Sequence, residues 1–330
     1  MGITTTHEHL LIDFSVVFTE PREASGRKLM DEKVSIKNLG WIRYNWASNR
    51  DNLRILDEET STWEARQYFN AGGSTIVDVT SVGLARDPRA LARISRATGL
   101  NIVMGAGNYV QISHPPELQD LSVEQIAGQI IHDVERGVGD TGIRSGIIGE
   151  IGCSWPWHDS EKKVLEAAVI AQRETGAPLL IHPGRNERAP IDLLNAVEKW
   201  GGNLNRTVMG HIERTVYDRG VLNELINSGA YLNFDLFGHE SSFYPLAPES
   251  YIPADHERIE MVEYMVSEGK QGSVLLAHDI CTKHRLKTYG GHGFDHILTR
   301  VVPRMRARGM KQEIIRLILV DNPTRMLTFD

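Results

Sequence analysis

The chain repeats one local pattern along most of its length: a helical segment, a turn that contains glycine, and a short run rich in β-branched residues. Predicted strands cover residues 4–9, 74–80, 101–107, 145–151, 178–183, 207–212, 230–235 and 273–279. Predicted helices cover residues 57–71, 88–98, 122–135, 160–175, 190–200, 219–228, 256–268 and about 292 to the C-terminus. Strands that alternate with helices form parallel sheets. Eight of them in 330 residues predict an α/β protein with a closed (β/α)8 TIM barrel, rather than a doubly wound open sheet.

The segment from Leu10 to Asp57 is the exception to this pattern. It shows no strand-length alternation, although Trp41, Tyr44 and Trp46 fall in a plausible short helix. A connection of this length is typically functional. No linker or composition shift divides the chain, so we predict that residues 1–330 form a single (β/α)8 domain.

Charge and cysteine content restrict the partners. The net charge of -7, without a long Lys/Arg tract, argues against nucleic acid as a partner. Two cysteines cannot make a disulfide framework, and no apolar run has the length of a membrane span. We therefore expect a cytoplasmic protein that binds neither nucleic acid nor membrane.

The first predicted strand contains the sequence Thr6-His7-Glu8-His9. Strand side chains alternate with a period of two, so His7 and His9 share one face and Glu8 points the opposite way. This spacing excludes a helical HExxH zinc site. The pair alone is equally compatible with two hydrogen-bonded core histidines, so a metal site requires further ligands to converge on it.

Further ligand types stand at the ends of the other predicted strands, where reactive residues of such barrels lie. Glu150 within GIIGEIG is the most informative, because burial of an unpaired carboxylate costs several kcal/mol. A histidine beside a turn could simply cap that turn, but six such residues together predict a metal site. The set is His7, His9, Glu150, His182, His211 and Asp279. Imidazoles and carboxylates in this number suit two divalent ions, zinc first, with manganese or iron as alternatives.

The segments THEH, GIIGEIGCSWP, IHPGR, AHDI and YGGHGFDHIL resemble the phosphotriesterase family of the amidohydrolase superfamily, and the resemblance covers essentially the whole chain. It implies that His7, His9 and Asp279 bind the more buried metal, that His182 and His211 bind the more exposed one, and that Glu150 bridges them. Phosphotriesterase itself uses a carbamylated lysine as the bridge. The predicted strand here has no lysine, so we expect assembly without bicarbonate and no paraoxon-type activity.

A two-metal site activates water and polarises the substrate oxygen. We expect a hydroxide shared by the metals to attack a carbonyl, with Asp279 as the catalytic proton shuttle. The resemblance implies cleavage of an amide in a small anionic N-acyl amino acid or amino sulfonate. The best candidate is N-acetyltaurine, which would give acetate and taurine. A lactonase or phosphotriesterase on the same centre, or a non-catalytic metal-binding scaffold, are the alternatives.

Loops after the predicted strands supply candidate substrate-binding residues. The cations Arg185, Arg188, Lys283 and Arg285 could bind an anionic group, and Tyr109 could line the pocket. Each cation taken alone is more typical of a solvated loop charge, and only the set together indicates an anionic substrate. The resemblance also implies a homodimer. Because relatives carry extra residues before the His-x-His motif, we expect either a longer native chain or another segment over the barrel base.

Overall fold

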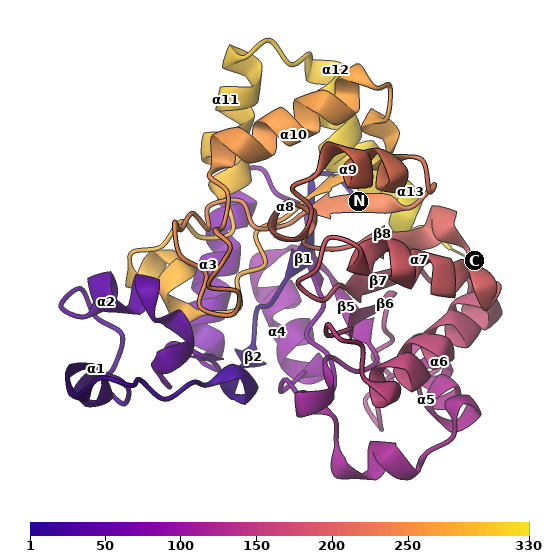
Figure 1. Cartoon of the computed structure of the whole chain (residues 1–330), viewed down its shortest axis with the longest axis horizontal. Coiled ribbons are helices and arrows are strands. Elements are labelled where there is room, and N and C mark those ends of the chain that lie inside the picture. Colours follow the sequence, from indigo (N-terminus) through magenta and orange to yellow (C-terminus); the bar gives the residue numbers. More distant parts are fainter. Residues whose placement is uncertain (330) are drawn as a thin grey trace.

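Eight parallel strands form a nearly closed barrel in the computed structural model, which describes residues 1–329 (Figure 1). A backbone hydrogen bond of 3.1 Å from Asp279 N to His7 O joins the last strand region to the first. The prediction of a TIM barrel is therefore confirmed. In sheet order the strands are β1 (Thr4–Glu8), β4 (Thr75–Asp78), β5 (Asn101–Ala106), β6 (Ile147–Gly152), β7 (Leu179–His182), β8 (Thr207–Met209), β9 (Tyr231–Phe234) and β10 (Val274–Leu276).

Helices surround this barrel, and local signals set their ends. The predicted N-cap Ser122 makes a capping box with Gln125, and α4 ends at Gly99 with a positive φ of 81°. The outer helices are α3 (Glu58–Asn70), α4 (Pro88–Thr98), α5 (Val123–Glu135), α6 (Asp159–Thr175), α7 (Ala189–Lys199), α9 (Arg219–Ile226), α10 (Asp255–Ser267), α11 (Val302–Ala307), α12 (Gln312–Arg316) and α13 (Asn322–Leu327).

The barrel interior is apolar at the end where the strands begin. Val77, Leu180, Val208 and Leu275 pack there with other strand residues, and Met326 and Leu327 of α13 pack against the same cluster. The interior is closed at this end by the C-terminal helix, which leaves the opposite end for polar residues. The expectation that another segment covers the base agrees with this packing.

The segment after β1 contains more structure than the sequence predicted. The short strands β2 (Ile12–Asp13) and β3 (Arg54–Ile55) pair antiparallel, and α1 (Ala24–Leu29) precedes the expected helix, α2 (Leu39–Tyr44). Two-residue strands are too short to show alternation, which explains why no strand was predicted here.

Two predicted strands extend three residues too far at their C-terminal ends. β8 ends at Met209 and β10 at Leu276, so His211 and Asp279 lie in the loops that follow them. Both residues have positive φ angles, 54° and 50°. Non-glycine residues in this left-handed region cost about 1–3 kcal/mol each and concentrate at functional sites. After His211 the chain turns into a short helix, α8 (Ile212–Thr215).

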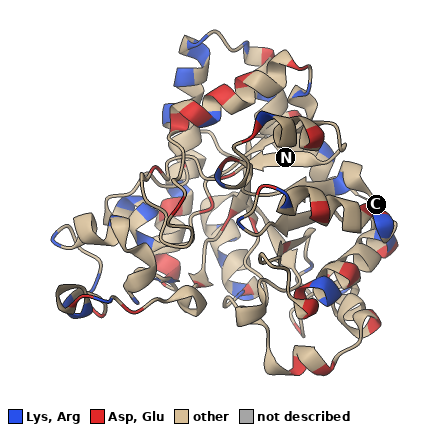
Figure 2. Cartoon of the chain, viewed as in Figure 1, with Lys and Arg blue, Asp and Glu red and all other residues tan. Residues whose placement is uncertain are grey.

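The outer surface carries both signs of charge. Figure 2 shows Lys and Arg interspersed with Asp and Glu on the outer helices, including α6 and α10. Neighbouring charges pair there, as in the two hydrogen bonds that Arg308 donates to Glu263 at 2.7 and 2.8 Å. Among residues 1–329, no helix combines the length and apolar character needed to cross a bilayer.

Candidate metal centre

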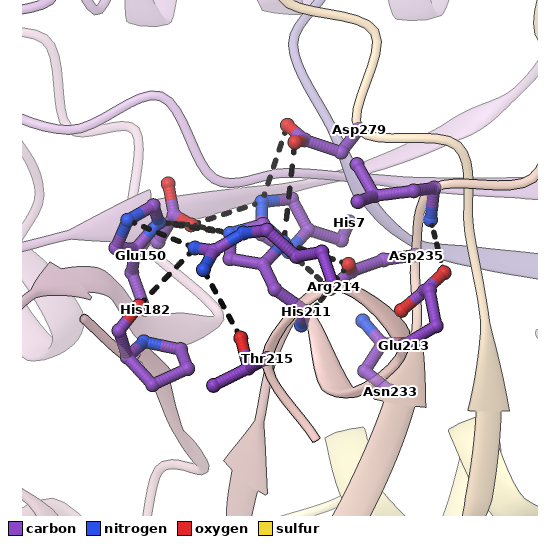
Figure 3. A network of polar contacts seen from close by, with 12 residues as sticks. His7, Glu150, His182, His211, Glu213, Arg214, Thr215, Asn233, Asp235 and Asp279 are labelled. Carbon is purple, nitrogen blue, oxygen red and sulfur yellow. Dashed lines mark hydrogen bonds and ion pairs between the residues drawn. The ribbon is translucent and has the colours of Figure 1, made fainter. Parts of the chain in front are cut away.

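The polar residues predicted at the strand ends come together at one mouth of the barrel, and Figure 3 labels all of them except His9. Glu150 lies at the centre of the group. Its Oε1 is 2.8 Å from His182 Nδ1, 2.9 Å from His211 Nε2 and 3.3 Å from His7 Nε2. One carboxylate oxygen therefore faces three imidazoles that come from three different strand ends.

The other side of the group is formed by β1 and the loop after β10. Asp279 Oδ1 is 3.2 Å from His9 Nε2 and 3.6 Å from His7 Nε2. The opposite ring nitrogen of His9, Nδ1, lies 2.9 Å from Thr80 Oγ1, which fixes the orientation of the ring. All six predicted ligands are thus close neighbours.

The donor atoms fit divalent cations better than they fit one another. Both ring nitrogens of His7 are buried and make no hydrogen bond of good geometry with the described residues, although Nδ1 lies 3.0 Å from Asp235 Oδ2 and Nε2 lies 3.3 Å from Glu150 Oε1. His182 Nδ1 and His211 Nε2 are 2.8 Å apart. Two imidazole nitrogens at this distance cannot both present lone pairs unless a proton or cation lies between them. Neutral histidines with carboxylates are a ligand set for zinc and similar ions.

The pKa values show how strongly these groups interact. Burial lowers the pKa of His7, but the carboxylates of Glu150 and Asp235 outweigh it and raise that pKa well above its usual value. Burial raises the pKa of Glu150, but His7 and His182 outweigh it and lower that pKa well below its usual value. Burial dominates at His182 and lowers its pKa to about 3. The site thus keeps its carboxylates ionised and attracts positive charge.

Asp235 is a site residue that the sequence analysis missed. It lies directly after β9, accepts a 2.7 Å hydrogen bond from His211 Nδ1, and places Oδ2 3.0 Å from His7 Nδ1. His7, His211 and Asp235 form a second group with metal-ligand spacing. The signal was available, because Asp235 ends a predicted strand just as Asp279 does.

Glu8 points away from this cluster, as the alternation along β1 predicted. Its carboxylate is buried and accepts hydrogen bonds from the backbone amides of His278 and Ile280, at 3.0 and 3.2 Å. It also accepts one from His278 Nδ1 at 2.6 Å. Glu8 therefore anchors the two residues that flank Asp279, which explains how this loop keeps its left-handed turn.

A cavity opens over the cluster, with about 580 Å³ of space free of protein atoms when the open solvent at its mouth is included. Three of the predicted substrate-binding residues line it, namely Tyr109, Arg185 and Arg285. Arg188 and Lys283 do not line it. Arg188 is exposed and pairs with Glu224 at 2.7 Å, and Lys283 pairs with Asp51 at 2.7 Å. These two cations were proposed only from their place after a strand, which does not show the direction of a loop side chain.

The cavity also contains Arg214, which the sequence analysis missed. Its guanidinium donates to Pro183 O at 3.1 Å and to Thr215 Oγ1 at 3.0 Å, and one amino group lies 3.2 Å from His182 Nε2 (Figure 3). Arg214 lies in α8, a turn that the sequence does not indicate, because the apolar run from residue 207 reads as a strand through Ile212.

The comparisons with known proteins agree with this geometry. A sequence model of the phosphotriesterase family matches residues 1–327. The N-acetyltaurine hydrolase of Mus musculus is 42% identical over 333 residues, which cover 100% of this chain and 94% of the relative. The phosphotriesterase-related protein of Nematostella vectensis is 42% identical over 332 residues, with 100% and 95% covered.

A solved structure is also similar over almost the whole chain. The crystal structure of a resiniferatoxin-binding protein from Rhodobacter sphaeroides superimposes with a TM-score of 0.95 and is 34% identical, covering 99% of this chain and 90% of that chain. The residues matched by the family model include all eight barrel strands and all six predicted metal ligands. The chain therefore belongs to the phosphotriesterase family.

Proposed function

We propose that this chain is a metal-dependent hydrolase that cleaves the amide bond of a small anionic N-acyl amino acid or amino sulfonate. N-acetyltaurine is the best candidate, with acetate and taurine as products. The observation that carries the proposal is the convergence of four imidazoles on Glu150 and Asp279 beneath a small cavity. Full-length relatives named N-acetyltaurine hydrolase support the choice of substrate.

The residues would hold two divalent ions, for which we propose zinc. His7, His9 and Asp279 would hold one ion, His182 and His211 the other, and Glu150 would lie between them. When bound, such a pair lowers the pKa of water and polarises a carbonyl oxygen. β6 contains no lysine, and Lys162 and Lys163 belong to α6, so assembly would not need a carbamylated side chain.

Asp279 is the residue best placed to move a proton. Its side chain is 14% exposed, against 4% for Glu150 and 0% for Asp235, so it is the most accessible of these three carboxylates, and it lines the cavity together with Glu150. Burial raises its pKa, but His9 and His7 outweigh this and lower it, so it is ionised and able to accept a proton. We propose that it takes a proton from the attacking water and delivers it to the leaving amine nitrogen.

Acid release from a panel of substrates tests this function. The panel contains N-acetyltaurine, N-acetyl-β-alanine, a series of lactones and a phosphotriester, each measured with metal-loaded protein. We expect kcat/KM to be highest for an N-acetylated anion. Highest activity on a lactone or the phosphotriester would support the alternative hydrolase activities, and turnover of no member would support a non-catalytic metal-binding role.

The remaining proposals rest on the sequence patterns for the domain and the location, and on the family resemblance for the dimer. We propose a single domain over residues 1–330 and a homodimer located in the cytoplasm. Light scattering coupled to gel filtration measures the mass in solution, and limited proteolysis measures the domain limits. A monomeric mass would contradict the dimer.

A further inference from the structure

Buried guanidinium groups in this protein differ in how their charge is balanced. Arg258 is fully buried and has two carboxylate partners, Glu213 at 3.2 Å and Asp255 at 2.9 Å. This is the usual arrangement, because a buried charge without a partner is strongly destabilising. Arg258 therefore provides an internal reference for the arginines of the cavity.

Arg185 and Arg214 depart from that reference. Both line the cavity, and within residues 1–329 neither has a carboxylate oxygen within 4.0 Å. Arg185 donates from Nε to Tyr244 OH at 2.8 Å, and its guanidinium carbon lies 5.1 Å from the centre of the Tyr244 ring. Its two terminal amino groups donate no hydrogen bond to any described residue, so the fork that normally binds an oxyanion is free.

Arg214 has no carboxylate partner among the described residues. Arg214 is 4% exposed and donates to Pro183 O and Thr215 Oγ1, which are uncharged acceptors, and one of its amino groups lies 3.2 Å from His182 Nε2. Positive charge therefore accumulates on one part of the cavity wall without a compensating anion from the chain.

Arg285 also lines the cavity but is bonded differently. It donates to the carbonyl oxygens of His278 and Asp279 and so supports the turn that carries Asp279. Both of its terminal amino groups hold that turn, which carries a proposed metal ligand. We therefore assign it a positioning role and exclude it from the anion site. Arg214 also donates from both terminal amino groups to the chain, so its part in the anion site is its positive charge, and the free fork belongs to Arg185.

We propose that Arg185 and Arg214 together bind the anionic head group of the substrate, a sulfonate or carboxylate, and that Tyr244 orients Arg185 for this contact. This inference rests on the proposed function and deepens it, because it names the residues that select an anionic substrate. Contact between Arg214 and His182 places the head group beside the His182 side of the metal cluster. The rest of the cavity, including Phe14, Trp46 and Leu84, is apolar and suits the acyl and methylene groups.

The test compares anionic and neutral substrates in variants with a matched control. The first variant is Arg185→Gln. The second is Arg214→Lys, a substitution that keeps the positive charge but removes the guanidinium. The control is Arg188→Gln, because Arg188 lies outside the cavity. We measure kcat and KM for N-acetyltaurine, N-acetyl-β-alanine and neutral N-acetylethanolamine. A lost charge-assisted hydrogen bond predicts that Arg185→Gln reduces the preference for the anions about 10- to 100-fold, mainly through KM. Arg214→Lys should show a smaller loss, and Arg188→Gln none.

Calorimetric titration with isethionate, an anion without an amide, tests the site without turnover. We expect wild type and Arg188→Gln to bind it and Arg185→Gln to lose binding, with unchanged metal content and melting temperature. Unchanged binding and unchanged substrate preference in Arg185→Gln would overturn the anion site. If wild type hydrolyses no N-acyl substrate, the proposed function fails, and loss of isethionate binding in Arg185→Gln still supports the site. The ratio between the two anionic substrates shows whether sulfonate or carboxylate is preferred.

Discussion

Asp235 accepts two hydrogen bonds from His211, one of 3.0 Å from the backbone amide and one of 2.7 Å from the ring nitrogen Nδ1. This pair fixes both the left-handed backbone of His211 and the direction of Nε2, which faces Glu150. The same carboxylate reaches His7. One residue outside the predicted ligand set therefore orients two members of that set, as partners of metal-binding histidines commonly do.

Replacement of Asp235 by Asn should weaken metal binding. The amide removes the negative charge and turns one acceptor into a donor, which cannot serve both His211 and His7. We expect metal affinity to fall about 10- to 100-fold, measured by competition with a chromophoric chelator. The control is Asp192→Asn on the exposed face of α7. Equal affinity in both variants would contradict the orienting role of Asp235.

Replacement of Asp279 by Asn should separate proton transfer from metal binding. The amide oxygen can still act as a ligand, whereas the group can no longer accept a proton. We expect kcat to fall by about 100-fold or more while much of the metal remains, measured by steady-state kinetics and elemental analysis of the same sample. Near-normal turnover in this variant would rule out the shuttle.

Glu8→Gln should destabilise the turn that carries Asp279. Oε1 of Glu8 accepts from His278 N and Nδ1, and Oε2 accepts from Ile280 N. An amide cannot accept at both positions, so at least one buried donor loses its partner, which costs about 1–3 kcal/mol. Urea unfolding measures the free energy of unfolding of this variant. The control is Glu174→Gln, because Glu174 is an exposed residue of α6. The idea fails if both variants unfold at the same urea concentration.

Stability should depend on acid pH through Asp255. Burial raises its pKa, but His296, the amide of Gly238 and Arg258 outweigh this and lower the pKa from 3.8 to about 2. A carboxyl whose pKa is lower in the folded state stabilises the protein above its unfolded pKa. That contribution, about 2 kcal/mol, should disappear as the pH falls from about 4 to about 2. Unfolding free energies of wild type and Asp255→Asn should therefore differ less at the lower pH, and a constant difference would refute the assignment.

The sequence predicted the barrel and the ligand positions for a clear physical reason. Each strand of a parallel barrel is a local pattern, and its C-terminal end marks the active mouth, so Glu150 and His182 could be placed from spacing alone. Asp235 met the same criterion and was overlooked. Arg214 could not be placed, because α8 depends on the left-handed turn at His211, which the apolar sequence before it conceals.

Loop cations were the least predictable part of the site. Arg185 and Arg188 follow the same strand three residues apart, yet one lines the cavity and the other pairs with Glu224 at the surface. The direction of a loop side chain depends on tertiary partners such as Tyr244, which lies far along the chain. Sequence position could therefore restrict these residues to one end of the barrel, but it could not choose among them.

The most direct test of the account is a metal titration of chelator-treated protein during hydrolysis of N-acetyltaurine. Acetate release is measured as zinc is added in known ratios to the chain, with Asp279→Asn as a parallel sample. We predict negligible activity in the metal-free protein, a rise that ends at two ions per chain, and no comparable rise in the variant. Full acetate release by the metal-free protein, or no release at any metal ratio, would contradict the central claim of a two-metal amide hydrolase.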